Sequence, residues 1–259
     1  MGRVHLFELQ DQSWFPALLG DAGTAYLRAL ARLAKVHELL TPVVAEALDR
    51  SGRNRIVDLC SGAGGPAVSI AESLRNDGRD VALTLSDLRP NQWALDDLAA
   101  QGATVHPARV DAASVPSSLV GLRTIFNAFH HFEDAQALAV LRDAVSAGEP
   151  IAIVELSERS VASVLGSLLI PLFVLLMMPA VRPARALWLV LTYLIPILPL
   201  TIAWDGLVSH LRTRSPAELD ALVARVDAPG WTWRTERRRG SGGVGYTLLL
   251  GLPPEPTPS

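Results

Sequence analysis

A glycine-rich turn after a short apolar segment limits the possible folds of this 259-residue chain more than any other feature. Residues 55–59, RIVDL, have the length and apolar character of a buried strand in a parallel sheet. The next residues, CSGAGG, are unsuited to a strand, and their glycines permit positive φ and close approach of a ligand to the main chain. Pro66 then suits the first turn of a helix. A strand, a glycine turn and a helix N-terminus in this order are typical of nucleotide-binding sites.

The chain on either side of Pro66 alternates between strand and helix patterns. This alternation predicts right-handed βαβ units and a Rossmann-like, doubly wound α/β sheet. A final helix beginning at Ser215-Pro216 and two strands joined by a glycine loop at 240–243 predict a terminal antiparallel hairpin, which brings the sheet to seven strands. The other strands are expected at 55–60, 81–86, 103–106, 122–127 and 150–155, and helices at 66–76, 91–101 and 133–147.

Helical segments add to this sheet. Asp21 or Thr24 suits the beginning of a helix to about Leu40, and Thr41-Pro42 the beginning of another. This N-terminal helical segment either caps one edge of the sheet or, as a sharper alternative, places Trp14 and Phe15 so that they close over a ligand. We expect an N-terminal helical cap at 1–50, a cofactor-binding core at 51–156, a hydrophobic helical insertion at 157–206, a C-terminal helix and hairpin that complete the core at 207–252, and a disordered tail at 253–259.

The insertion contains two uncharged runs, 161–181 and 186–204, separated by the sequence RPAR. Each reaches or approaches the roughly 20 residues that span a bilayer. The arginines between the runs and the prolines within them weigh against a simple transmembrane hairpin and favour broken helices at the membrane interface. We therefore expect the protein on the cytoplasmic face of a membrane, as an integral hairpin or a monotopic protein. The alternative is a soluble cytoplasmic protein in which these runs form a lid or a homodimer interface.

Composition argues against several functions. The net charge of −3 gives no reason to expect a nucleic-acid partner. Cys60 is the single cysteine, so an intramolecular disulfide and a cysteine-built metal site are impossible, and we predict no metal ligands. Glu8 and Asp11 interrupt the apolar run that a signal peptide needs, so secretion is not expected.

Polar residues stand at or just after the ends of the expected strands. The carboxyl ends of parallel strands meet at one edge of a sheet, where open α/β sheets bind ligands. An acid about one βα unit after a glycine turn accepts hydrogen bonds from both ribose hydroxyls of a bound adenosine, and Asp87 is in that position. The complete set is Asp58, Asp87, Asp111, Asn127, His130, His131 and Glu155.

With the segments DLCSGAGG and NAFHHF, the chain resembles the class I S-adenosylmethionine-dependent methyltransferases from about Arg55 to Leu252. Asp58 matches the acid of the family's first motif, and Cys60 stands where its first glycine is usual. The resemblance implies that Asp58 lies near the methionine amino group and that Asp87 binds the ribose. The full set of cofactor-binding residues that it implies is Asp58, Cys60, Gly62, Gly64, Asp87, Asp111, Ala112 and Asn127.

The resemblance also implies an enzyme that uses S-adenosyl-L-methionine, similar to uncharacterised bacterial methyltransferases. The apolar insertion occupies the position of the family's substrate-recognition insertions, so we expect a hydrophobic or membrane-associated small molecule as methyl acceptor. His130 is the first candidate for a general base because it follows the fourth strand and histidine titrates near neutral pH. His131 and Glu155 are the other catalytic candidates, and all three could equally serve packing or helix capping.

Two alternatives stay open. Gly62-x-Gly64-x-x-Ala67 also satisfies the dinucleotide fingerprint, which would make the chain an NAD(P)-dependent oxidoreductase. Against it, Asp58 would oppose a pyrophosphate, and Lys35, the only lysine, leaves no Ser/Tyr-Lys proton relay. The second alternative is a non-catalytic, membrane-anchored protein that binds the cofactor without methyl transfer.

Overall fold

A computed structural model describes residues 2–90, 98–99, 102–240 and 245–254. These residues form one seven-stranded sheet in the order β3-β2-β1-β4-β5-β7-β6. Strands β1 to β5 are parallel, whereas β7 is antiparallel to both β5 and β6. The predicted α/β class and the terminal hairpin are therefore confirmed. The strands are β1 (Arg55–Asp58), β2 (Ala82–Leu85), β3 (Thr104–Val105), β4 (Leu122–Phe126), β5 (Ile151–Glu155), β6 (Thr232–Arg239) and β7 (Gly245–Leu252).

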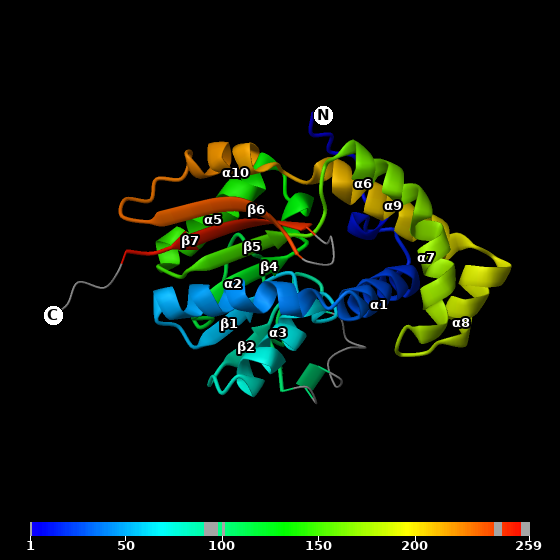
Figure 1. Ribbon diagram of the computed structural model, residues 1–259, viewed down its shortest axis with the longest axis horizontal. Coiled ribbons are helices and arrows are strands. Elements are labelled where there is room, and N and C mark those ends of the chain that lie inside the picture. The colour runs from blue at the N-terminus through cyan, green and yellow to red at the C-terminus, as the bar shows by residue number, and fades with distance from the viewer. Residues whose placement is uncertain (1, 91–97, 100–101, 241–244, 255–259) are drawn as a thin grey trace.

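Successive residues of a strand face different helical layers. Ile56 packs with α2 (Val36–Ser51) and α3 (Gly65–Asn76), whereas Val57 packs with α5 (Asp134–Ala147) and α10 (Pro216–Val223). Ala152 and Ile153 of β5 divide in the same way between the two cores. Side chains alternate across a strand, so a strand covered on both faces needs apolar residues at successive positions. Figure 1 shows α2 and α3 on one side of the sheet and α5 and α10 on the other.

A third hydrophobic core joins α1 (Ala17–Leu33) to the insertion, beyond the carboxyl end of β5. Tyr26 of α1 shares this core with Val174 and Trp188. Figure 1 shows α1 beside the helices of the insertion at one end of the molecule. The insertion comprises α6 (Val161–Gly166), η4 (Ser167–Leu169), α7 (Ile170–Met177), η5 (Met178–Ala180), α8 (Ala186–Leu189), η6 (Val190–Leu194) and α9 (Ile197–Arg212). The N-terminal helices thus contribute to two cores, α2 to the sheet and α1 to the insertion.

The boundaries of the first two helices differ from the prediction. The chain turns at Lys35, which adopts a left-handed conformation with φ of 48°, and α2 follows directly. α2 continues through Pro42, so the prediction that Thr41 and Pro42 begin a helix is wrong. Pro42 lacks one helical hydrogen bond, but burial of Leu40 and Val44 in the core outweighs this local loss. The helix expected at 91–101 and most of the tail fall on residues outside the described ranges.

Candidate active site

Strand β1 ends in a buried acid. Asp58 is 2 % exposed, and its Oδ1 accepts a hydrogen bond of 2.7 Å from Thr124 Oγ1 on the neighbouring strand β4. Burial raises the pKa of Asp58 to about 7, although this hydrogen bond acts in the opposite direction. Among the described residues, the groups that influence its ionisation are hydroxyls and the like-charged Asp87, with no basic side chain. Asp58 is therefore a carboxylate whose charge a bound cation would stabilise.

The turn after Asp58 is held by Asp87. The backbone N–H of Gly62 donates to Asp87 Oδ2 over 2.8 Å, and the N–H of Arg89 donates to Oδ1 over 2.7 Å. Cys60 has φ of 59°, a left-handed conformation that favours glycine, which explains why glycine is usual at this point of the motif. Gly64 has φ of 86°, and a Cβ there would lie 2.4 Å from Leu98 Cδ2. The structure thus places Asp58, Cys60 and Gly62 in one turn after β1 and brings Asp87, which follows β2, into contact with that turn.

Three other predicted cofactor residues have different surroundings. Asp111 lies next to Val110, whose N–H donates to the Asp87 carbonyl over 2.9 Å, and the Asp111 carboxylate accepts the Ala113 N–H. Ala112 is buried in the core beneath α5. Asn127 adopts φ of 51° and uses its side-chain oxygen to accept hydrogen bonds from residues 156 and 157, so it holds the beginning of the insertion.

A cavity of about 450 Å³ lies one residue away from the glycine turn, whereas the turn itself and Asp87 line a separate cavity of only about 10 Å³. The larger cavity lies between the N-terminal segment, α1 and the loop after β2, and its lining includes Phe15, Thr24 and Arg89. Thr24 lines the cavity and also packs against the turn. Its Cγ2 is so close to Gly62 that a Cβ at that position would lie only 3.2 Å away. Phe15 lines the cavity, whereas Trp14 is exposed, and closure of this pair over a ligand stays a prediction.

Glu155, at the end of β5, holds His130 in place. The backbone N–H and Nδ1 of His130 lie 2.9 and 2.8 Å from the two oxygens of Glu155. The Nε2 atom on the other side of the ring lies 3.4 Å from Oε1 of Glu8. Burial disfavours the charged ring, but the two carboxylates outweigh it and raise the pKa of His130 to about 10. The two carboxylates thus favour a positively charged group at the position of this ring.

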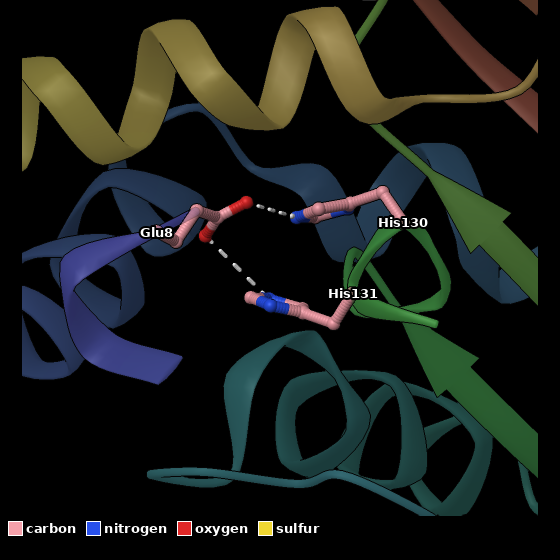
Figure 2. Close-up of side chains that lie close together, drawn as sticks. All are labelled: Glu8, His130 and His131. Atoms are coloured by element: carbon pink, nitrogen blue, oxygen red, sulfur yellow. Dashed lines mark ion pairs between the residues drawn. The ribbon is translucent and has the colours of Figure 1, made fainter. Parts of the chain in front are cut away.

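Glu8 lies between His130 and His131, which both belong to η3 (Phe129–His131) after β4 (Figure 2). The two rings are 4.4 Å apart between centroids. His131 places Nδ1 2.8 Å from Asp11 Oδ1 and Nε2 3.7 Å from Glu8 Oε2. Burial opposes the charge of Glu8, but the histidines and Arg212 keep the pKa of its carboxyl below the ordinary value.

Helix α9 attaches the N-terminal segment to this cluster. Arg212 is buried and places Nη1 2.7 Å from Asp11 Oδ2 and 3.4 Å from Glu8 Oε1, while its Nη2 donates to the His131 carbonyl. Asp205 lies earlier in the same helix, and its carboxylate accepts hydrogen bonds from the backbone N–H groups of residues 9 and 10. Sequence reasoning noticed Glu8 and Asp11 only as interruptions of an apolar run. Two acids in an otherwise apolar and aromatic N-terminal segment were the available signal.

Comparison with solved structures shows the fold. The methyltransferase SibL, in its apo form, has a TM-score of 0.50 and 17 % identity over 86 % of this chain and 57 % of that protein. The O-methyltransferase NcsB1, solved with S-adenosylmethionine and 2-hydroxy-5-methyl naphthoic acid, has a TM-score of 0.46 and 17 % identity over 85 % of this chain and 57 % of its own. Human N-acetylserotonin methyltransferase, solved with S-adenosylmethionine, has a TM-score of 0.47 and 16 % identity over 88 % and 56 %.

This chain thus spans little more than half the length of these proteins. No known family profile matches the sequence, and no curated protein matches it. The likeness to SibL defines the class of the fold, which is that of the class I S-adenosylmethionine-dependent methyltransferases. The sheet order agrees, because the antiparallel β7 between β5 and β6 differs from the 3-2-1-4-5-6 order of dinucleotide-binding sheets.

Proposed function

We propose that this protein binds S-adenosylmethionine at the ends of β1 and β2 and transfers its methyl group. The observation that carries the proposal is a glycine turn that begins at the buried Asp58 and whose Gly62 N–H donates to Asp87. Asp58 is a buried carboxylate with a raised pKa, which suits a cationic partner such as the methionine ammonium group. Each oxygen of Asp87 accepts one backbone N–H, and its remaining lone pairs suit the two ribose hydroxyls.

Methyl transfer from a sulfonium depends mainly on holding donor and acceptor in line at a short distance. We propose His130, His131 and Glu155 as the catalytic side chains, because they stand at the ends of β4 and β5 beside the proposed cofactor site. Glu155 orients His130, and His131 has the more exposed ring, which a bound acceptor can contact. The proposed role of His131 is to orient and polarise the acceptor atom, and that of the buried His130 and Glu155 is to position this side of the site.

The acceptor class follows from the insertion. The helical run Val161–Ala180 is long and apolar enough to cross a membrane, whereas the second run in the described residues is bent by 82°. Val174 and Met178 of the first run are buried in the third core, so this helix keeps one side on the protein. Its opposite side exposes Leu168, Leu172 and Leu176. A helix with one packed and one apolar exposed side suits docking into a membrane interface, and we propose a hydrophobic, membrane-dissolved acceptor.

The cofactor site is tested by binding of labelled S-adenosylmethionine to the full chain. Asp87→Ala is expected to weaken binding, because it removes the proposed ribose acceptor and releases the Gly62 N–H. Asp80→Ala is the matched control, since Asp80 is exposed at the opposite end of the same strand. Absence of binding by the unmodified protein, or equal binding by Asp87→Ala and the control, would refute the proposed site.

Methyl transfer is tested separately with tritiated donor and a crude lipid extract. Incorporation of label into an organic-phase product is the expected result. Binding of the donor without any labelled product would favour the non-catalytic cofactor-binding protein instead. Flotation with phospholipid vesicles tests the membrane part, and a protein that remains at the bottom of the gradient would contradict docking.

A further inference from the structure

We propose that Glu8, His130 and His131 bind one divalent transition-metal ion. This inference goes beyond methyl transfer and differs from the expectation that the chain has no metal ligands. The three side chains come from two distant segments, the N-terminal segment and η3, and converge on one point (Figure 2). Each offers one ligand atom, and these atoms all lie within 4.8 Å of one another.

The spacing of the ligand atoms suits an ion. Metal–nitrogen and metal–oxygen bonds in zinc sites are about 2.0–2.2 Å long, so two ligands at a tetrahedral angle lie about 3.4 Å apart. Glu8 Oε1 lies 3.4 Å from His130 Nε2, and Glu8 Oε2 lies 3.7 Å from His131 Nε2. Both separations exceed an ordinary N–H···O hydrogen bond, which is about 2.7–3.2 Å.

The far nitrogen of each ring faces a carboxylate. Metal-binding histidines almost always donate their second N–H to a carboxylate, a carbonyl or water, which fixes the tautomer and the ring orientation. Nδ1 of His130 makes this hydrogen bond with Glu155 over 2.8 Å, whereas Nδ1 of His131 forms an ion pair of 2.8 Å with Asp11 that lacks hydrogen-bond geometry. Both rings therefore have a carboxylate at Nδ1 and direct Nε2 toward Glu8.

Two ring nitrogens of the cluster have a carboxylate beside them but no hydrogen bond of good geometry, Nε2 of His130 and Nδ1 of His131. The His130 side chain is only 1 % exposed, and its Nε2 meets Glu8 only at the longer distance of 3.4 Å. An ion between them would give both atoms a direct partner. Nε2 of His130 points toward Glu8, which is where the ion would lie (Figure 2).

The charges around the cluster agree with a divalent cation. Glu8, Asp11 and Glu155 are in direct contact with the rings, and Arg212 is the basic side chain that contacts two of these acids. With neutral imidazoles, the three carboxylates exceed the one guanidinium by two negative charges, which one divalent ion balances. Two imidazoles and one carboxylate suit Zn²⁺ or Fe²⁺ and leave a position for water. That open position lies on the side of His131, whose ring is about a third exposed.

The test uses the full chain, stripped of metal with a chelator and titrated with Zn²⁺ in calorimetry. We expect one ion per chain and a rise in the melting temperature. Glu8→Gln and His131→Gln are expected to abolish this binding, and Glu155→Gln to weaken it about 10–100-fold by freeing the His130 ring. His106→Gln is the matched control, because His106 lies after β3 and away from the cluster.

Co²⁺ provides a readout that needs no variant. Binding at a four-coordinate site of nitrogen and oxygen ligands produces intense visible d–d absorption, which Zn²⁺ should then displace. Failure of the unmodified protein to bind one ion, or binding by Glu8→Gln and His131→Gln equal to that of His106→Gln, would overturn the proposal. Circular dichroism of each variant confirms that loss of binding is not loss of fold. The assay contains no methyl donor, so its failure leaves the proposed methyl transfer untouched.

Discussion

Replacing Asp58 by asparagine should stabilise the ligand-free protein at neutral pH while it weakens cofactor binding. The folded protein raises the pKa of this carboxyl from 3.8 to about 7, so it holds the Asp58 proton more tightly than the unfolded chain does. This tighter proton binding contributes fully to the free energy of unfolding below pH 4, and the contribution is lost as the pH rises through 7. A shift of about three units corresponds to about 4 kcal/mol at about 1.36 kcal/mol per unit.

Asparagine removes the charge and keeps an oxygen that can accept the Thr124 hydroxyl. Its new N–H donors lower the gain by about 1–3 kcal/mol if they find no acceptor. We therefore expect the unfolding free energy of Asp58→Asn at pH 8 to exceed that of the unmodified protein by about 1–3 kcal/mol, and to fall below it by about 1–3 kcal/mol near pH 4, where the carboxyl is protonated and only the cost of the unpaired N–H donors remains. Urea denaturation across this range measures the difference, and Asp80→Asn is the exposed control.

Adding S-adenosylmethionine should reverse the order of the two proteins. A ligand at 100 times its Kd stabilises the form that binds it by about 2.7 kcal/mol. The unmodified protein should gain this amount because its carboxylate pairs with the ammonium group, whereas Asp58→Asn should gain much less. Parallel pH dependences for the two proteins would refute the reasoning about the buried charge, and equal stabilisation by the cofactor would refute the role of Asp58 in binding.

Three further changes test other parts of the structure. Arg212→Ala leaves two partly buried acids without their guanidinium and should lower the unfolding free energy by about 3–5 kcal/mol in urea denaturation; a loss below 1 kcal/mol would show that the N-terminal segment is held by other contacts. Asn127→Ala should cost about 1–3 kcal/mol and speed proteolysis near residue 157, because it removes an acceptor shared by the main chain there. The double change Leu172→Glu, Leu176→Glu should reduce vesicle binding about 100-fold. Each leucine that no longer enters the lipid removes about 1.5 kcal/mol or more from the free energy of binding. Val120→Glu, which changes another exposed apolar residue that lies just before β4 and outside the insertion, should leave vesicle binding unchanged.

Local patterns were sufficient to predict the sheet. Each strand from β1 to β5 is a short apolar run between turn residues, and the hairpin alternates on one strand and is apolar on the other. The glycine turn was also readable, because positive φ and the close contact of Gly64 with Leu98 are properties of a few adjacent residues and their immediate neighbours. The strands and the glycine turn could be predicted because residues close together in the sequence determine both features.

Contacts between distant segments could not be read in the same way. Glu8 and Arg212 are far apart in the sequence, and neither belongs to a motif that predicts contact with the other. Thr41 and Pro42 have the sequence of a helix N-terminus, yet the burial of Leu40 and Val44 carries α2 through them. Asn127 lies in the motif that suggested cofactor contact, but its amide oxygen binds main-chain N–H groups that only the folded sheet brings near. In each instance the deciding partner lies in another element.

Helix α1 has two sets of neighbours, and this gives the protein a route for thermodynamic linkage. Thr24 lies against Gly62 of the glycine turn, while Tyr26 packs with Val174 of the insertion. A displacement of the insertion would therefore also act on α1, whose residues line the cavity. If the protein binds a membrane and the cofactor as proposed, any coupling between the two is reciprocal, so the factor by which the membrane changes the affinity for cofactor equals the factor by which cofactor changes the affinity for the membrane. Helix α1 would then transmit a displacement of the insertion to the proposed cofactor site.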